Sequence, residues 1–266
     1  MPEDITIVSS DSVYFQAHQT YLLHFEELTS GGPVTNEEHS PNVLHLPESG
    51  SVLNLLLSAA YNTTRNGGQV GASDISLSDL GLAVAALKTY GIPLQAALAE
   101  KSLMSSAFES HCQRGPTSAL QVYAIAASHV PDLHVLAVYA SEFLLSLSLA
   151  SISEEQADKI DPAYVRKLFI LHLDRIKEFK QLMTGLPQTH GPLPRCNDTG
   201  GGVLLDAWAR ATAYLSWAAS ADLPNSKIDD VMMSVMDRFT CTTCKESLQC
   251  RFRILKQEWL LVKRTI

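Results

Sequence analysis

The chain lacks the features that mark several common classes of protein. Its 266 residues hold 28 acidic and 20 basic side chains, so the formal net charge is −8. No basic stripe is present, although proteins that bind nucleic acid or an anionic membrane by charge need one. No stretch reaches the roughly 18–20 apolar residues of a membrane span. The nearest, FLLSLSLASI at 143–152, is short and rich in serine.

Signals for export and for common enzymes are absent too. The opening MPEDITIVSS has neither the basic start nor the apolar run of a signal peptide. The five cysteines are an odd number, which does not fit a secreted disulfide framework. The sequence has no G-x-S-x-G, and its glycine runs lack the following Lys-Ser/Thr of a phosphate-binding loop. We therefore expect an intracellular protein, cytoplasmic or nuclear, that is not an enzyme.

The first part of the chain mixes strand and helix patterns. Residues 4–18, DITIVSSDSVYFQAH, alternate apolar and polar positions around a polar turn and predict a hairpin of two strands. Residues 42–46, NVLHL, predict a third short strand. Helices are expected next, one over 51–61 and one whose buried face comprises Leu80, Val84 and Leu87.

After Arg114 the pattern is helical alone. We predict helices over 117–128 and 131–147, a helix opening at Ser153, and a longer helix from Pro162 whose apolar stripe comprises Val165, Phe169, His172, Ile176, Phe179 and Met183. The stretch GLPQTHGPLPRCNDTGGG has no periodicity and predicts a linker, and two amphipathic stripes follow it. The predicted organisation is a mixed domain at 1–110, a helical extension at 115–184, a linker at 185–202 and a carboxy-terminal helical segment at 203–266.

Several stretches resemble the BTB/POZ family. DITIVSSDSVYFQAHQTYL resembles the opening strand, hairpin and first helix of a BTB domain. VLHLPESGSVLNLLLSAAY resembles its third strand, acidic turn and next helix, and DLGLAVAALKTYGIPLQAAL its closing helical pair. The later helices and the tail EWLLVKRTI resemble BTB-domain proteins abundant in mushroom-forming fungi. The resemblance spans nearly the whole chain, and it implies an α+β BTB/POZ domain followed by an all-α helical extension.

This resemblance implies a function in protein–protein interaction without catalysis. BTB domains commonly homodimerise through the first strand and first helix, and they recruit other protein partners. The interface positions that the family implies are Val13, Phe15, Tyr21 and Leu22. An alternative role is that of substrate adaptor for a cullin ubiquitin ligase. Residues 35–37, TNE, place a polar residue where the cullin-binding motif has a hydrophobic one, which argues against that role.

The densest group of reactive side chains lies in CTTCKESLQC at 241–250. Cys241 and Cys244 form a C-x-x-C pair, which can be half of a zinc site, a redox pair, or two thiols that pack a helix start. A zinc site needs four nitrogen or sulfur ligands, and the other two would come from His190 with Cys196, or from His111 with Cys112. A lone C-x-x-C outside a βαβ context favours packing thiols and no metal or cofactor. The alternative is a zinc-stabilised metalloprotein, or an enzyme, centred on Cys241 and Cys244.

The same stretch carries a helix-start signal. Thr243 followed three residues later by Glu246 fits a capping box, which predicts that the last helix starts at Cys244. Cys250 then lies about 240° further around the helix, at about 100° per residue, and faces away from Cys244. The three thiols are therefore not expected to share one site. His172, on the apolar stripe of its helix, is expected to be a core histidine.

Overall fold

The computed structural model describes residues 5–18, 43–61, 75–193, 196, 198 and 201–266. The chain divides into two compact units. The amino-terminal unit comprises residues 1–143 with 159–161, and the carboxy-terminal unit comprises residues 144–158 with 162–266. The first mixes α and β structure, and the described part of the second is helical. The predicted domain limits near 110, 185 and 202 follow changes of sequence pattern and stay predictions.

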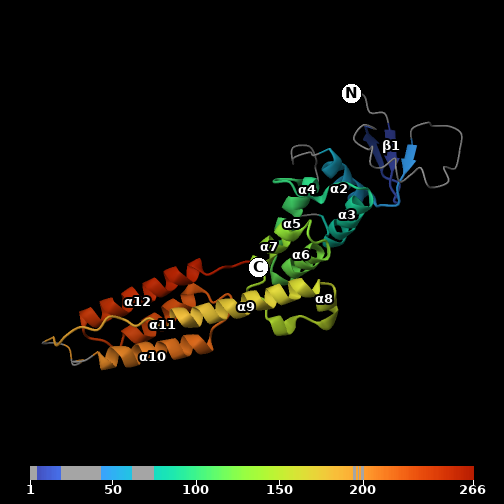
Figure 1. Cartoon of the computed structure of the whole chain (residues 1–266). Helices are drawn as coiled ribbons and strands as arrows, with labels where there is room; N and C mark the ends of the chain where they lie inside the picture. Colours follow the sequence, from blue (N-terminus) through green and yellow to red (C-terminus); the bar gives the residue numbers. More distant parts are fainter. Residues whose placement is uncertain (1–4, 19–42, 62–74, 194–195, 197, 199–200) are drawn as a thin grey trace. The chain divides into compact units, whose positions relative to one another are not determined.

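A three-stranded sheet with the order β2–β1–β3 opens the amino-terminal unit (Figure 1). Strand β1 (Ile5–Val8) pairs antiparallel with β2 (Tyr14–Ala17) and parallel with β3 (Val43–His45). The predicted hairpin and third strand are confirmed. Ile7 and Val8 are buried, whereas Tyr14 is 70% exposed.

The hairpin turn is joined to the helix that follows the sheet. The backbone N–H of Val13 donates to Ser9 Oγ at 2.8 Å and closes the turn. Asp11 Oδ1 accepts the backbone N–H of Gly50 at 2.8 Å, at the start of α2 (Gly50–Ala60). The Ser9 hydroxyl and this N–H both lower the pKa of Asp11, because they stabilise its carboxylate.

The remaining helices of the amino-terminal unit are α3 (Leu77–Thr89), α4 (Leu94–Ala97), α5 (Leu103–Gln113), α6 (Pro116–Ser128) and α7 (His134–Glu142). The predicted face of Leu80, Val84 and Leu87 is fully buried in α3. Helix α7 is shorter than the predicted 131–147, because turns with i→i+3 hydrogen bonds occupy both of its flanks.

The carboxy-terminal unit contains η2 (Leu149–Ser151), α8 (Glu154–Asp158), α9 (Pro162–Leu182), α10 (Gly202–Trp217), α11 (Asn225–Met236) and α12 (Thr242–Leu261). Helices α9 to α12 pack side by side (Figure 1). Their largely aliphatic core includes two aromatic pairs, with ring centroids of Trp208 and Phe252 at 5.1 Å and of Phe179 and Trp259 at 4.9 Å. No helix among the described residues combines the length and hydropathy that crossing a membrane requires.

The buried face of α9 differs from the predicted stripe. His172, Phe179 and Met183 are buried as expected, but Phe169 is 40% exposed. The buried residues of this helix are Tyr164, Leu168, Leu171, His172, Arg175 and Phe179. The buried face of α9 is therefore rotated around the helix relative to the predicted apolar stripe. The prediction used apolar residues only, and so it left out the buried, charged Arg175.

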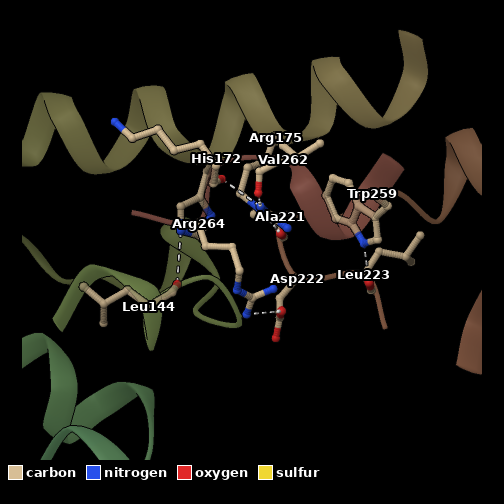
Figure 2. A network of polar contacts seen from close by, with 10 residues as sticks. Leu144, His172, Arg175, Ala221, Asp222, Leu223, Trp259, Val262 and Arg264 are labelled. Carbon is tan, nitrogen blue, oxygen red and sulfur yellow. Dashed lines mark hydrogen bonds and ion pairs between the residues drawn. The ribbon is translucent and has the colours of Figure 1, made fainter. Parts of the chain in front are cut away.

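Arg175 is 1% exposed and is held by backbone carbonyls (Figure 2). Its Nε donates to Ala221 O at 2.6 Å, and one terminal nitrogen donates to Val262 O at 2.8 Å and Lys263 O at 2.7 Å. The guanidinium carbon lies 4.2 Å from the ring centre of Trp259. This one side chain therefore fastens the α10–α11 turn and the segment after α12 to α9.

Two further contacts support the same region (Figure 2). His172 is buried, and its Nε2 lies 3.1 Å from Leu144 O. The Trp259 indole N–H donates to Leu223 O at 2.9 Å. The expectation of a core histidine at 172 is confirmed.

Candidate metal centre

Four side chains from two distant segments of the carboxy-terminal unit bring their donor atoms together. His190 and Cys196 belong to the connection between α9 and α10, Cys241 immediately precedes α12, and Cys244 lies in its first turn. The donor atoms of all four lie within 4.8 Å of one another. No disulfide joins the three cysteines of the group, which are free thiols. The cluster can hold a metal ion.

The spacing of the donor atoms matches a tetrahedral site. Cys196 Sγ and Cys244 Sγ are 3.8 Å apart, and His190 Nε2 lies 3.6 Å from Cys241 Sγ and 3.0 Å from Cys244 Sγ. Zn–S bonds of about 2.3 Å and a Zn–N bond of about 2.0 Å at tetrahedral angles give S···S separations of about 3.8 Å and S···N separations of about 3.5 Å. Two of these three separations agree with a tetrahedral shell, and the separation of His190 Nε2 and Cys244 Sγ would have to lengthen by about half an ångström.

The connection reaches the cluster by running antiparallel to α12. Arg251 of α12 donates to Leu182 O and, at 2.8 Å, to Gly185 O. Ser247, one turn earlier in the helix, donates to Gln188 O at 2.6 Å. His190 follows at the level of Cys244, a further turn earlier. Successive turns of α12, taken toward its N-terminus, thus contact successive residues of the connection. These contacts fix the connection at three points, although its sequence has no periodicity.

Two glycines make this close approach feasible. A Cβ at Gly185 would lie 2.5 Å from a terminal nitrogen of Arg251. Gly201 has a left-handed φ of +75°, and a Cβ there would lie 2.2 Å from Thr189 Cγ2, next to His190. Gly201 is the N-cap of α10. The absence of a side chain therefore lets the connection pass directly over the helix start.

Asp198 joins the cluster to α10. It is buried at 9% exposure, and its carboxylate accepts the backbone N–H groups of Val203 at 3.2 Å and Leu204 at 2.9 Å. These N–H groups have no partner within the helix, and a carboxylate there is favoured by the helix dipole. Asp198 comes two residues after Cys196. A change that displaces Cys196 from the cluster is therefore expected to disturb the cap of α10 as well.

The imidazole of His190 is oriented by its own backbone. Its Nδ1 lies 2.6 Å from Gly191 O and donates to it. Nε2 is then left as the acceptor that faces the thiols of Cys241 and Cys244. A ligating histidine commonly donates its second nitrogen to a carbonyl in this way. The same hydrogen bond is the main cause that raises the pKa of His190.

The two thiols of the C-x-x-C pair have opposite electrostatic environments. The backbone N–H of Cys244, in the first turn of α12, is the main cause that lowers the pKa of the Cys241 thiol to about 7. Burial raises the pKa of the Cys244 thiol to about 12. Cys241 and Cys244 could hold a cation together, and its charge would stabilise both side chains as thiolates.

The structure decides between several sequence-based expectations. Of the two pairs proposed to complete a C-x-x-C site, His190 with Cys196 lies at the cluster. His111 and Cys112 are buried in α5 of the other unit, where His111 Nε2 lies 2.8 Å from Ile75 O. The interpretation of Cys241 and Cys244 as packing thiols alone is incomplete, because they share a donor cluster. Cys250 is exposed and stands apart from it, as expected.

The capping-box prediction is wrong. Helix α12 begins at Thr242, with Cys241 as its N-cap, and the backbone N–H of Lys245 donates to Cys241 O at 3.2 Å. The start lies two residues before the predicted one because the Cys241 carbonyl already accepts a helical hydrogen bond. Cys241 is thereby held beside Cys244 by the first turn of the helix.

The interface residues implied by the family resemblance are described in part. Val13 is 42% exposed and Phe15 is partly buried. Tyr21 and Leu22, and residues 35–37, lie outside the described residues. The structure therefore places two of the four positions, both on the hairpin.

Sequence reasoning missed the residues that position the donor cluster, namely Asp198, Gly201, Ser247 and Arg251. Asp198 ahead of a helical pattern carried the usual signal of an N-terminal cap. Ser247 and Arg251 carried none, because their partners are 59 to 69 residues away in the chain.

Comparisons with known proteins add no assignment. A scan against protein-family models, a search of curated proteins and a search of solved structures each found no match.

Proposed function

We propose that the carboxy-terminal unit is a zinc-stabilised helical module. The single observation that carries the proposal is the convergence of one imidazole and three thiol donors, all within 4.8 Å of one another, at His190, Cys196, Cys241 and Cys244. Thiolate and imidazole ligands favour zinc over the hard cations Mg²⁺ and Ca²⁺. Four protein ligands close a tetrahedral shell, which is the pattern of a structural site; catalytic zinc keeps one position for water or substrate.

The bound metal would link the α9–α10 connection to the start of α12. The connection has little regular structure of its own, and three contacts with α12 fix it, at Arg251, Ser247 and the cluster. Structural zinc contributes directly to folding free energy, with apparent values of about 10–16 kcal/mol in small zinc modules. The metal is therefore expected to decide whether this connection is ordered.

Metal analysis of the protein purified under reducing conditions tests the proposal. We expect one zinc per chain, a lower melting temperature after chelation, and tetrahedral thiolate bands when Co²⁺ replaces zinc. C244S should lose the metal, whereas C250S is the matched control, because Cys250 is an exposed thiol of the same helix away from the cluster. The proposal would be contradicted if the purified protein contained no metal and a chelator did not change its melting temperature.

We propose further that the whole chain is a non-catalytic protein-interaction module of the BTB/POZ type, which homodimerises and recruits a protein partner. The observation in favour is the hairpin with a parallel third strand, which carries the partly exposed Val13 and the exposed Tyr14. Apolar side chains exposed together at an edge strand and the turn before it are typical of a surface that another chain covers. Cullin adaptor activity is not proposed.

Light scattering across micromolar concentrations tests the dimer. We expect a dimer for the wild type and a monomer for Y14E, since a charge is costly in an apolar interface. V135E is the matched control, because Val135 of α7 is 80% exposed and lies outside the sheet. If the wild-type protein stayed monomeric at every concentration, this second proposal would be wrong, and the zinc proposal would be unaffected.

A further inference from the structure

The surface between α10 and α11 carries a groove of about 360 Å³. Small, mostly buried side chains form its floor: Ala207, Ala211, Val231 and Val235. Larger polar side chains form its walls, namely Arg210 and Tyr214 from α10, and Lys227, Asp230, Ser234 and Arg238 from α11 and the residues after it. The groove lies wholly within the carboxy-terminal unit, on helices that the metal cluster does not include.

The groove is positively charged within an acidic protein. Three of its wall residues are cationic, and one is anionic. Arg210 pairs with Asp206 at 2.9 Å, and both are well exposed. No ion pair joins Arg238 to any other residue that the structure describes. The carboxy-terminal unit holds 15 lysines and arginines against 13 acids, while the rest of the chain holds 5 against 15. The groove is therefore a local site of attraction for negative charge.

Exposed aromatic rings continue the same face of α10. Tyr214 is 48% exposed, and the Lys227 ammonium lies 5.4 Å from its ring centre. Trp217, three residues further along the helix, is 90% exposed. Residues three and four apart share a helix face, so Arg210, Tyr214 and Trp217 form one stripe. A tryptophan with so large an exposed fraction, next to a cationic groove, is typical of a binding surface.

The spacing of the charges indicates the size of the ligand. Lys227 and Arg238 are eleven positions apart on α11 and its C-terminal end, which corresponds to about 16 Å at about 1.5 Å per helical residue. A single small anion cannot contact both. A continuous polyanion would bring phosphates, spaced by only a few ångströms, onto Asp230 between them. A peptide with acidic residues about 16 Å apart fits these two charges, and an apolar residue near the Lys227 end fits the adjacent ring of Tyr214.

We propose that the α10–α11 groove binds an acidic, partly apolar peptide segment of a partner protein. Acidic side chains of the peptide contact Lys227 at one end of the groove and Arg238 at the other, and Arg210 of the facing helix adds a third positive charge. An apolar side chain packs on the exposed rings of Tyr214 and Trp217. This surface is distinct from the hairpin of the amino-terminal unit, so the partner and the proposed dimer do not compete for one site.

Fluorescence anisotropy with a labelled glutamate–leucine peptide of about 12 residues, long enough to span the groove as a helix, tests the proposal. The double variant K227E/R238E should weaken binding by about tenfold or more, since it replaces two attractions by two repulsions. The matched control is K177E/K180E, which makes the same charge change at exposed positions of α9. W217A should weaken binding without changing the salt dependence.

The contrary results are equally defined. Equal affinity for the two double variants would show that net charge alone attracts the peptide. Tighter binding of a lysine–leucine peptide or of a single-stranded oligonucleotide, or no binding at all, would also overturn the proposal. Circular dichroism of each variant checks that the helices remain folded. Weaker binding by a folded variant can then be attributed to the groove and not to unfolding.

Discussion

Helices begin differently in the two units. In the amino-terminal unit α2, α3 and α5 each follow a serine whose side chain accepts a backbone N–H of the first turn. In the carboxy-terminal unit α10 and α12 begin at Gly201 and Cys241, which provide no side-chain cap. Asp198 caps α10 from the connection, and the start of α12 meets His190, 51 residues before Cys241. At these helix starts the first unit uses a serine next to the helix, whereas the start of α12 also needs a contact made far along the chain, at His190. Single changes at such long-range contacts should cost more stability than the loss of a local cap.

The largest effect is expected at Arg175. R175M keeps much of the side-chain volume but leaves the buried carbonyl of Ala221 and the partly buried carbonyls of Val262 and Lys263 without this donor. The loss of these hydrogen bonds should lower the free energy of unfolding by about 3–5 kcal/mol. Urea unfolding measures the loss. R210M is the control, since it removes an exposed pair with Asp206 and should cost no more than about 0.5 kcal/mol. Similar losses in both variants would contradict the long-range role of Arg175.

A smaller loss is expected at Gly201. G201A places a Cβ 2.2 Å from Thr189 Cγ2 and strains a left-handed backbone position, with a cost of about 1–3 kcal/mol. It should also weaken metal binding, because Thr189 precedes His190. G202A is the control: a Cβ there meets no atom within 4 Å, and alanine is the better helix former. Thermal unfolding and competition with a colorimetric chelator measure the two effects, and equal behaviour of the variants would count against the close approach.

The buried histidine should make the carboxy-terminal unit sensitive to mild acid. Burial is the main cause that lowers the pKa of His172, and the Arg175 charge adds to it. Below a pH of about 6.5 the unfolded state binds a proton that the folded state resists, so stability falls as pH falls, by at most about 1.4 kcal/mol per pH unit. Above that pH the contribution is constant. H172Q should flatten the slope between pH 6.5 and 5 in urea unfolding, and an unchanged slope would contradict this role of the buried imidazole.

The smallest effect is expected in the amino-terminal unit. Ser76 Oγ accepts the backbone N–H of Asp79 at 3.0 Å at the start of α3. S76A should cost about 1 kcal/mol, the usual value for losing an N-terminal cap. S78A, at an exposed position of the same turn, should stay within about 0.5 kcal/mol of the wild type. If S76A destabilised the protein as much as R175M, the contrast between short-range and long-range specification would be wrong.

The same contrast explains what the sequence could predict. The hairpin, the third strand, α2 and α3 were predicted because their alternation, apolar spacing and capping signals lie within a few residues. Helix α11 was missed, although Ile228, Val231 and Val235 carry helical spacing, because Pro224 provides no cap at its start. The interior position of Arg175 had no local signal, because its acceptors lie 46 to 88 residues away.

The candidate metal centre was predictable by half. The C-x-x-C spacing of Cys241 and Cys244 indicated two donors. For the other two donors of a four-ligand site the sequence left two pairs open, His190 with Cys196 and His111 with Cys112. The choice depended on the path of the connection, which Ser247 and Arg251 fix through backbone carbonyls rather than through a recognisable motif. The predicted linker proved to hold the missing ligands, because a segment without periodicity can still be ordered by contacts along a neighbouring helix.

The position of Cys196 and Cys241 has a topological consequence. A metal bound to both would close a ring of 46 residues, 196–241, that contains the whole of α10 and α11. A protease cut in the turn between those helices would then leave two fragments still tied together, and they would separate only when a chelator opens the ring. The metal would act on this segment as a disulfide does in secreted proteins, but in a form that the reducing interior of a cell permits.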